Sequence, residues 1–127
     1  SYGNNYEMAL FCSNGKPKLK GERKKAIWDI NIDSGATYLH PTQKPIALPS
    51  YAIPDFTKKN EIVLDLFLGS GSTMVAAHQL KRKCYGMELD PKYCQVIIDR
   101  MQKLDSKLSI KINSKEYIKR DKNEKNG

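Results

Sequence analysis

The sequence predicts an α/β protein built on a parallel, doubly wound sheet between two layers of helices, a three-layer α/β/α fold of which this chain holds a part. Three observations predict it. The nearly continuous apolar run 61–67 is typical of a strand buried on both faces. A glycine-containing turn, a helix-forming stretch and a second short apolar run follow it. A strand, helix and strand joined this tightly require two parallel neighbouring strands with the helix as their crossover.

The elements before this unit are less regular. Residues 7–12 and 26–32 are expected to form two strands on either side of a lysine-rich loop. Residues 46–56 have a helical composition but contain Pro49 and Pro54, and a proline inside a helix removes a hydrogen bond and collides with the preceding turn. We therefore expect this segment to be a broken helix.

The central unit is predicted in more detail. Gly69 and Gly71 end the first strand, and a helix over 72–81 follows, with Ser70 or Ser72 as its N-cap. The next strand covers 83–88. Pro91 then starts a helix, with Asp90 as the expected N-cap and with one apolar face formed by Tyr93, Val96, Ile97, Met101 and Leu104.

The C-terminal part is basic and poor in large apolar residues. Residues 108–113 alternate with a period of two and predict a late strand. Residues 119–127 are expected to be mobile, because they have too little apolar surface to bury.

Composition limits the classes of function. Of the 127 residues, 39% are hydrophobic, and no apolar run approaches the roughly 20 residues of a membrane span. The three cysteines lack Cys-x-x-Cys spacing, which argues against a zinc site or a disulfide framework and for a reducing, cytoplasmic setting. The net charge of +8 favours a polyanionic partner such as nucleic acid. The candidate contacts crowd one loop: Lys16, Lys18, Lys20, Arg23, Lys24 and Lys25.

Two acids mark a candidate ligand site. In a doubly wound fold, ligands bind at the carboxyl ends of the strands, where Asp65 and the turn 69–72 are expected. Glu88 lies at the end of the next strand, where a carboxylate can accept hydrogen bonds from the hydroxyls of a ribose. A cofactor that carries a nucleoside is therefore expected.

The turn discriminates between nucleoside cofactors. A dinucleotide site needs a third glycine where this chain has Met74, and no Gly-Lys-Ser/Thr phosphate loop is present. Asp65 would repel a pyrophosphate but could receive the ammonium of an amino-acid moiety. This pattern favours S-adenosylmethionine over NAD or ATP. Two alternatives remain: an oxidoreductase with an unusual nucleotide loop, and a purely structural turn with Asp65 as a helix cap and Glu88 solvated.

At this point the sequence resembles a known family, the DNA amino-methyltransferases, which methylate adenine N6 or cytosine N4. The resemblance rests on Asp65-x-Phe67-x-Gly69-Ser70-Gly71-Ser72, preceded by His40-Pro-Thr-Gln-Lys-Pro45, and it extends over residues 6–104 through Trp28-Asp29, Gly86-Met-Glu88 and Pro91-Lys-Tyr93. His40 has no acidic partner in the sequence and is assigned no catalytic role.

The resemblance implies a set of residues that bind the cofactor. Asp65, Phe67, Gly69 and Gly71 would line its methionine and adenosyl parts, and Glu88 would bind the ribose. The methionine carboxylate would lie beside Thr42, Gln43 and Lys44. With the two serines of the turn, the predicted cofactor-binding residues are Thr42, Gln43, Lys44, Asp65, Phe67, Gly69, Ser70, Gly71, Ser72 and Glu88.

The family's catalytic Pro-Pro loop is not present. None of the six prolines is adjacent to another, so no catalytic residue is assigned in this chain and no metal is expected. The resemblance implies a C-terminal, cofactor-binding fragment of a DNA methyltransferase, with adenine N6 favoured over cytosine N4, that is inactive in isolation. Its partners would be double-stranded DNA and a missing catalytic half or partner chain, and a homodimer stays open.

The sequence divides into three expected regions. Residues 1–39 are expected to belong to the catalytic and target-recognition region, residues 40–104 to bind S-adenosylmethionine, and residues 105–127 to form a basic, partly disordered tail. The alternative function, from a different class, is a non-catalytic remnant or partner subunit that binds nucleic acid or cofactor.

Overall fold

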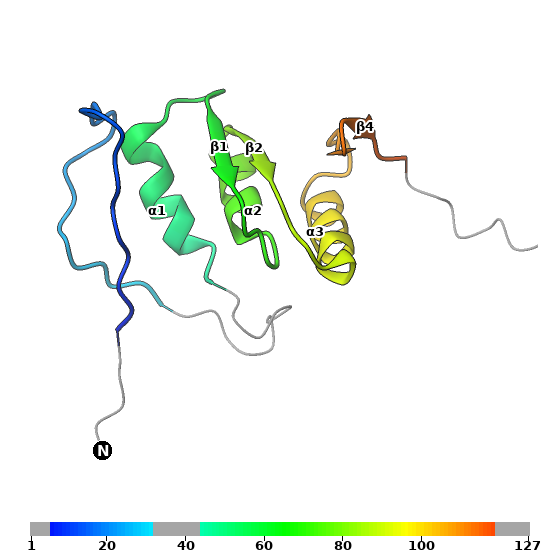
Figure 1. Cartoon of the computed structure of the whole chain (residues 1–127), viewed down its shortest axis with the longest axis horizontal. Coiled ribbons are helices and arrows are strands. Elements are labelled where there is room, and N and C mark those ends of the chain that lie inside the picture. The colour runs from blue at the N-terminus through cyan, green and yellow to red at the C-terminus, as the bar shows by residue number, and fades with distance from the viewer. Residues whose placement is uncertain (1–5, 32–43, 119–127) are drawn as a thin grey trace, which may run out of the picture.

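The computed structural model describes residues 6–31 and 44–118, and its central part is the predicted succession of strand, helix, strand and helix (Figure 1). This confirms the α/β fold class. In chain order the elements are α1 (Ala47–Phe56), β1 (Ile62–Asp65), α2 (Ser72–Gln79), β2 (Lys83–Gly86), α3 (Pro91–Leu104), β3 (Lys111–Ile112) and β4 (Lys115–Glu116).

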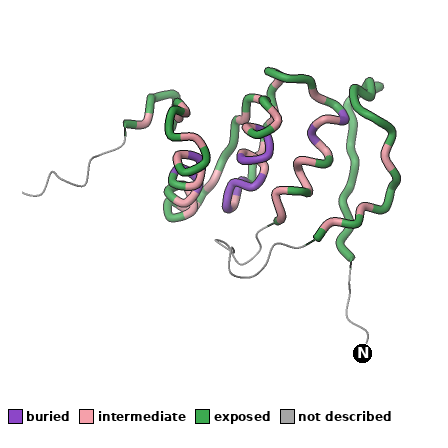
Figure 2. Tube along the Cα trace, turned by 180° about the vertical axis from the view of Figure 1, so that it is seen from behind, coloured by how far each residue is buried: buried purple, intermediate pink, exposed green. Residues whose placement is uncertain are grey.

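The strands β1 and β2 are parallel, and α2 is the crossover between them. Ile62 lies opposite Lys83, and Asp65 lies opposite Gly86, so both strands end at the same edge of the sheet. Ala76 and Ala77 of α2 are completely buried, and Val63 and Cys84 pack against them from the two strands. Small side chains on α2 therefore allow it to lie close to the sheet (Figure 2).

A second apolar cluster joins α3 to the rest of the fold. It contains Leu68 after β1, Val75 of α2, and Ile97 and Met101 of α3. The spacing of Ile97 and Met101 places both on one face of the helix. This confirms the predicted apolar face at its centre, whereas Leu104 at its end is 41% exposed.

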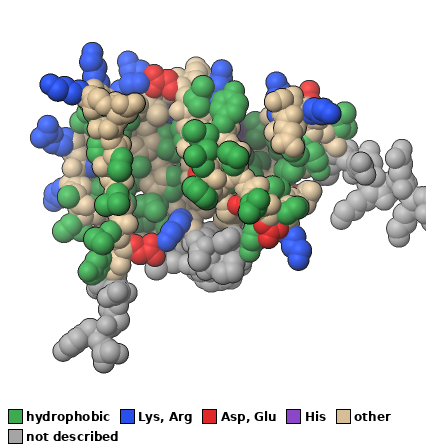
Figure 3. Space-filling view, in the orientation of Figure 1, with side chains coloured by type: hydrophobic (Ala, Val, Ile, Leu, Met, Phe, Trp, Pro, Cys, Tyr) green, Lys and Arg blue, Asp and Glu red, His purple; other side chains and the backbone are tan. Residues whose placement is uncertain are grey.

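The opposite face of β1 and β2 is open. Ile62 and Leu64 are each about 60% exposed, and Tyr85 of β2 is 59% exposed. Hydrophobic side chains gather over these strands in Figure 3. Within the described ranges 6–31 and 44–118, helices cover one face of the strands, although the sequence predicts burial on both.

The expectation of a broken helix over 46–56 is wrong, because α1 is continuous. Pro49 lies in the first turn, where its backbone nitrogen would have no partner within the helix in any case. Pro54 lies in the last turn, two residues before the helix ends. Both prolines thus occupy the ends of a ten-residue helix, where a missing hydrogen bond disrupts little.

Of the N-caps predicted for the other two helices, only that of α3 is confirmed. Neither Ser70 nor Ser72 caps α2: the N-cap is Gly71, in the left-handed conformation with φ 86°, and α2 ends at Gln79 instead of residue 81. A left-handed residue at this position favours glycine over serine. Asp90 does cap α3, since its side chain accepts a hydrogen bond from the Lys92 amide.

The two strands expected in the N-terminal segment do not form. Residues 7–12 and 26–31 have no strand partner in the described part of the chain, and residue 32 lies outside it. The segment lies beside α1 on the side away from β1 (Figure 1), and the rings of Phe11 and Phe56 stack at 5.1 Å. A β-forming sequence stays irregular without a neighbouring strand to take its backbone hydrogen bonds.

The predicted late strand over 108–113 is shorter than expected and belongs to a hairpin. Lys111 and Ile112 of β3 pair with β4 across a turn whose residues, Asn113 and Ser114, both have positive φ. Residues 119–127, expected to be mobile, lie outside the described residues. None of the described helices is long and apolar enough to cross a membrane.

Candidate cofactor site

A cavity of about 590 Å³ opens where β1 and β2 end. This volume is in the range that holds a small organic ligand, and the edge of the sheet is the one at which doubly wound folds bind ligands. The cavity is lined by Lys44, Asp65, Leu66, Phe67, Leu68, Gly69, Ser70, Ser72, Thr73, Met87, Glu88 and Leu89.

The carboxylate of Asp65 is held at the end of β1. Its Oδ1 accepts a hydrogen bond from the Phe67 amide at 2.9 Å, which fixes the first bend of the turn. The Asp65 carbonyl accepts from the Met87 amide, so the turn stays tied to the end of β2. Oδ2 of Asp65 is left to accept a hydrogen bond from a ligand.

Glu88 links the two strand ends through both of its carboxylate oxygens. Oε2 accepts from the Gly69 amide at 2.8 Å, and Oε1 accepts from the Asp90 amide at 2.9 Å. Each carboxylate oxygen has two lone pairs, so Glu88 can still accept hydrogen bonds from the hydroxyls of a ligand. The residue therefore shapes the turn as well as lining the cavity.

The conformation of the turn between β1 and α2 favours glycine at two positions. Gly69 and Gly71 have φ 55° and 86°, in the left-handed region. A Cβ on Gly71 would also lie 3.1 Å from Cγ1 of Ile97. Beside it, the Ser72 hydroxyl donates to the Lys44 carbonyl at 2.7 Å and joins the start of α2 to the segment before α1.

Lys44 lines the cavity, but its ammonium pairs with the carboxylate of Glu7. The side chains of Lys44 and Glu7 are 52% and 77% exposed. Exposed ion pairs contribute little free energy, so a ligand carboxylate in the cavity can compete with Glu7 for Lys44.

The structure thus brings most of the predicted cofactor-binding residues together. Gly71 forms the turn without lining the cavity, and Thr42 and Gln43 lie outside the described residues. Sequence reasoning missed five lining residues, Leu66, Leu68, Thr73, Met87 and Leu89. Their signal was position alone: Leu66, Leu68, Met87 and Leu89 lie within three residues of the end of β1 or β2, and Thr73 lies in the first turn of α2. Phe67 and Leu89 are at least 90% exposed and offer apolar walls to a ligand.

The six predicted nucleic-acid contacts fall into two groups. Lys20 and Lys24 are bound within the chain, and both attach the loop to the end of α1 or the start of β1. The other four side chains are exposed: Lys16, Lys18, Arg23 and Lys25. In Figure 3, Lys and Arg side chains gather over this end of the molecule.

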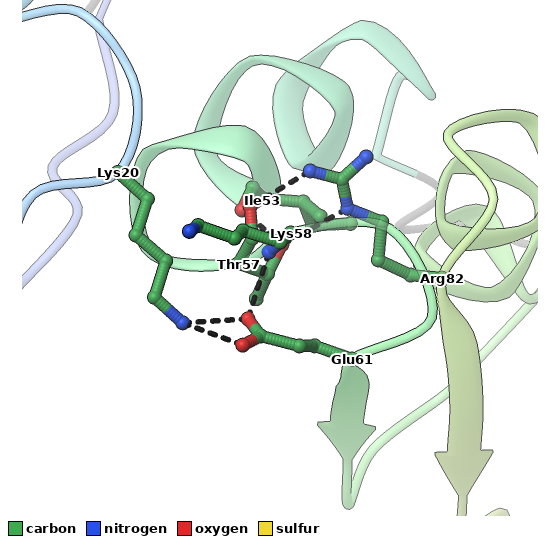
Figure 4. Close-up of polar contacts among 6 residues, drawn as sticks. All are labelled: Lys20, Ile53, Thr57, Lys58, Glu61 and Arg82. Carbon is green, nitrogen blue, oxygen red and sulfur yellow. Dashed lines mark hydrogen bonds and ion pairs between the residues drawn. The ribbon is translucent and has the colours of Figure 1, made fainter.

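Lys20 attaches the loop to β1 (Figure 4). Its ammonium bonds both carboxylate oxygens of Glu61, at 2.6 and 2.7 Å, and the Lys58 amide donates to the same carboxylate. These hydrogen bonds, that of Lys20 first, hold the pKa of Glu61 below its ordinary value of 4.5. The Lys20 amide also donates to the Asp55 carbonyl, which closes the end of α1.

Lys24 compensates the buried carboxylate of Asp55. The Lys24 ammonium lies 2.8 Å from Oδ1 of Asp55, a residue that is only 8% exposed, and 4.0 Å from the centre of the Tyr51 ring. The Trp28 ring packs against the Tyr51 ring, with 4.9 Å between the ring centres. Cation, aromatic rings and buried acid together attach the loop to α1.

Other chemistries find little support in the described residues. Burial, with the nearby charge of Asp65, raises the pKa of the Cys84 thiol to about 11, so the reactive thiolate is scarce at neutral pH. Over the ranges 6–31 and 44–118, no group of three His, Cys, Asp or Glu side chains is placed to hold a metal ion.

Comparison with known proteins yields one matching family. A family model described as DNA methylase matches residues 2–99. The chain is 32% identical over 102 residues to the type II methyltransferase M2.LlaDCHI of Lactococcus lactis subsp. cremoris, covering 78% of this chain and 36% of that protein. It is 44% identical over 98 residues to the type II methyltransferase M.BglI of Bacillus subtilis, covering 70% and 28%.

Solved structures show the same relationship. The crystal structure of the M1.HpyAVI–SAM complex superposes with a TM-score of 0.56 at 32% sequence identity and covers 65% of this chain and 43% of that one. TTHA0409 from Thermus thermophilus gives a TM-score of 0.53 at 28% identity, covering 66% and 32%. The chain therefore spans between 28% and 43% of the length of these four proteins.

Proposed function

The chain belongs to the DNA methylase family, and from this premise we propose that it binds S-adenosylmethionine at the ends of β1 and β2 as the cofactor-binding part of a site-specific DNA methyltransferase. The reaction would transfer the cofactor's methyl group to an exocyclic amine of a flipped base. We propose adenine N6 over cytosine N4 as the target. Mass spectrometry of nucleosides from methylated DNA distinguishes the two products.

The observation that carries the proposal is the pairing of two carboxylates around one glycine turn. Asp65 and Glu88 both line the cavity, and Glu88 bonds the Gly69 amide between them. An amino acid joined to a nucleoside offers an ammonium and ribose hydroxyls, which are donors for carboxylates, and a carboxylate that suits Lys44. A cofactor with a pyrophosphate would instead meet two like charges.

In this arrangement, the residues of the chain bind and orient the cofactor. Asp65 would accept from its ammonium and Glu88 from its ribose, while Phe67 and Leu89 would pack on the adenosyl part and exclude water. S-adenosylmethionine, when bound, supplies a methyl group activated by a sulfonium. Holding this methyl group in a fixed place lowers the entropy cost of the attack by the base.

Calorimetry on the whole chain tests this assignment. We expect Asp65→Asn and Glu88→Gln each to raise the Kd for S-adenosylmethionine about tenfold or more, as expected for a lost hydrogen bond to a charged group. Glu22→Gln, at an exposed acid of the basic loop, is the control and should leave the Kd unchanged. Equal affinities for all four proteins, or no binding to the unchanged chain, would contradict the proposal.

We further propose that catalysis needs residues beyond these 127. The six prolines include no adjacent pair, so the family's Pro-Pro loop has no counterpart here. The open apolar face of β1 and β2 and the greater length of the relatives support the same proposal, whether the remaining residues belong to the same polypeptide or to a partner chain. The purified chain should transfer no labelled methyl groups to DNA in a filter-binding assay. Methylation well above a blank without protein would refute this.

For DNA, we propose that the exposed members of the basic loop, Lys16, Lys18, Arg23 and Lys25, contact phosphates. Lys20 and Lys24 would instead hold the loop in place, since each already has a carboxylate partner. Phosphate contacts position a protein on DNA without reading the sequence, so the recognised sequence would be set elsewhere. A bacterial cytoplasm, where the DNA lies, is the setting that fits this function.

The missing Pro-Pro loop also favours a second candidate function. A chain that binds cofactor or DNA without catalysing transfer would act as a non-catalytic subunit or a degenerate remnant. Addition of the chain to a catalytic partner would restore methylation if it is a subunit and would have no effect if it is a remnant.

A further inference from the structure

One face of α3 supports the glycine turn from behind the cavity. Ile97 and Arg100 are three residues apart on this helix and therefore share a face. Ile97 lies under Gly71, so close that a Cβ there would be 3.1 Å from its Cγ1. Arg100 is half-buried next to it and reaches the two serines that flank Gly71.

Arg100 bonds the backbone and the side chains of the turn. Its Nη1 donates to the Ser70 carbonyl at 3.0 Å and lies 3.4 Å from the hydroxyls of Ser70 and Ser72. The Ser72 hydroxyl in turn donates a hydrogen bond to the Lys44 carbonyl at 2.7 Å. Both serines and Lys44 line the cavity, whereas Arg100 does not.

The position of this charge is not explained by the stability of α2. Arg100 lies at the N-terminal end of that helix, where the helix dipole disfavours a cation. At this position Nη1 of Arg100 bonds three oxygen atoms of one turn. All three contacts come from Nη1, whose N–H bonds are held in the plane of the guanidinium, whereas the ammonium of a lysine rotates freely.

We propose that Arg100 is a positioning residue of the cofactor site, which holds the Ser70–Ser72 turn in the conformation that binds S-adenosylmethionine. Only the identity of the ligand in this inference rests on the proposed function. The fixed conformation of the turn is a property of the chain without cofactor.

Arg82 provides a matched control within the same chain. It is also a half-buried arginine that bonds backbone and hydroxyl oxygens. It donates to the carbonyl and the hydroxyl of Thr57 (Figure 4), and also to the carbonyl of Leu80. It joins β2 to the end of α1 and does not line the cavity. If Arg100 only stabilises the fold, substitution of either arginine should have the same effect on the cofactor.

The test compares Arg100→Met, Arg100→Lys and Arg82→Met in two measurements on the whole chain. The first is amide hydrogen exchange at Gly69 and Gly71, without cofactor. We expect Arg100→Met to speed exchange at these amides about tenfold, with partial rescue by Arg100→Lys. Arg82→Met should speed exchange at Asn60, whose amide bonds the Lys81 carbonyl, and leave the glycines unchanged.

The second measurement is the Kd for S-adenosylmethionine, corrected for the folded fraction of each variant. Arg100→Met should raise the Kd about tenfold, Arg100→Lys less, and Arg82→Met not at all. Unchanged exchange at the two glycines, or equal effects of Arg100→Met and Arg82→Met on them, would overturn the inference. Should Arg100→Met fail to fold, Arg100→Lys against Arg82→Lys decides in the same way. Failure of the unchanged chain to bind cofactor would refute the proposed function, and the exchange data would still decide the role of Arg100.

Discussion

Gly71 shows at the scale of a residue how the sequence encodes the site. Its φ of 86° favours glycine for conformational reasons, and a Cβ would lie 3.1 Å from Cγ1 of Ile97, which would have to shift. The sequence predicted that a turn ends the first strand here. It could not show that Gly71 itself caps α2, because the capping pattern of the two serines is equally good and the decisive contact comes from α3, more than twenty residues later.

Gly71→Ala is expected to destabilise the fold and to weaken cofactor binding. Gly15→Ala is a matched control, because Gly15 has a similar φ of 81° but nothing within 4 Å of a Cβ. Gly15→Ala should cost about 1 kcal/mol of unfolding free energy through its backbone conformation alone. Gly71→Ala should cost about 1–3 kcal/mol more, since its Cβ must displace Ile97.

Urea unfolding monitored by circular dichroism measures both free energies, and calorimetry gives the Kd for the cofactor. Equal losses of stability for the two alanine variants would contradict the packing of Gly71 against α3. A Gly71→Ala variant that binds the cofactor normally would contradict the role of the turn.

At the scale of elements, α1 and the basic loop show where the sequence was misleading. Pro49 and Pro54 predicted a break, but their effect depends on which turn of the helix they occupy, and the segment does not reveal its own ends. The basic loop suggested six equivalent cations. Only the fold brings Asp55 and Glu61 to two of them, from residues more than thirty positions away. A local sequence pattern predicts local structure, but it does not predict ion pairs between residues that are distant in the sequence.

The link between Lys20 and Glu61 is expected to make stability depend on pH. The pKa of Glu61 in the folded chain is lowered, chiefly by Lys20, so the carboxylate stabilises the folded state at pH above 4.5. This contribution is lost as the pH falls below 4.5 and through the lowered pKa. Glu61→Gln should therefore flatten the dependence of the unfolding free energy on pH in this acidic range.

Glu22→Gln is the control for this experiment, because Glu22 is an exposed acid in the basic loop that contains Lys20. Urea unfolding at a series of pH values gives the slopes. An equal loss of stability on acidification for Glu61→Gln and the unchanged chain would contradict the role of the Lys20–Glu61 link.

At the scale of the whole molecule, the sequence predicted the central unit well, because β1, α2, β2 and α3 each have a complete local pattern. It predicted strands at 7–12 and 26–32 that need neighbours to form, and none is available in the described residues. It predicted most of the cavity, since Asp65 and Glu88 mark the strand ends. Of the two exposed apolar walls, Phe67 was predicted, whereas Leu89 was missed because an exposed leucine looks like a core residue in a sequence.

DNA binding should depend on the exposed part of the basic loop. Replacing Lys16, Lys18, Arg23 and Lys25 with Gln removes four charges, and each lost phosphate contact should lower the slope of log affinity against log salt by roughly 0.9. The control replaces four exposed lysines elsewhere and removes the same charge: Lys92, Lys103, Lys107 and Lys111. Fluorescence anisotropy across a salt series measures both slopes. If the slope changes equally in both quadruple variants, the effect is due to net charge, and the proposal that the basic loop contacts DNA is contradicted.

The most direct test of the central claim is to follow the backbone amides of Gly69, Gly71 and Glu88 by NMR while S-adenosylmethionine or NAD is added to the chain. We expect S-adenosylmethionine to shift these amides and to reach saturation, and NAD to leave them unchanged. If NAD shifts them and S-adenosylmethionine does not, or if neither does, the assignment of this cavity as a methyl-donor site is contradicted.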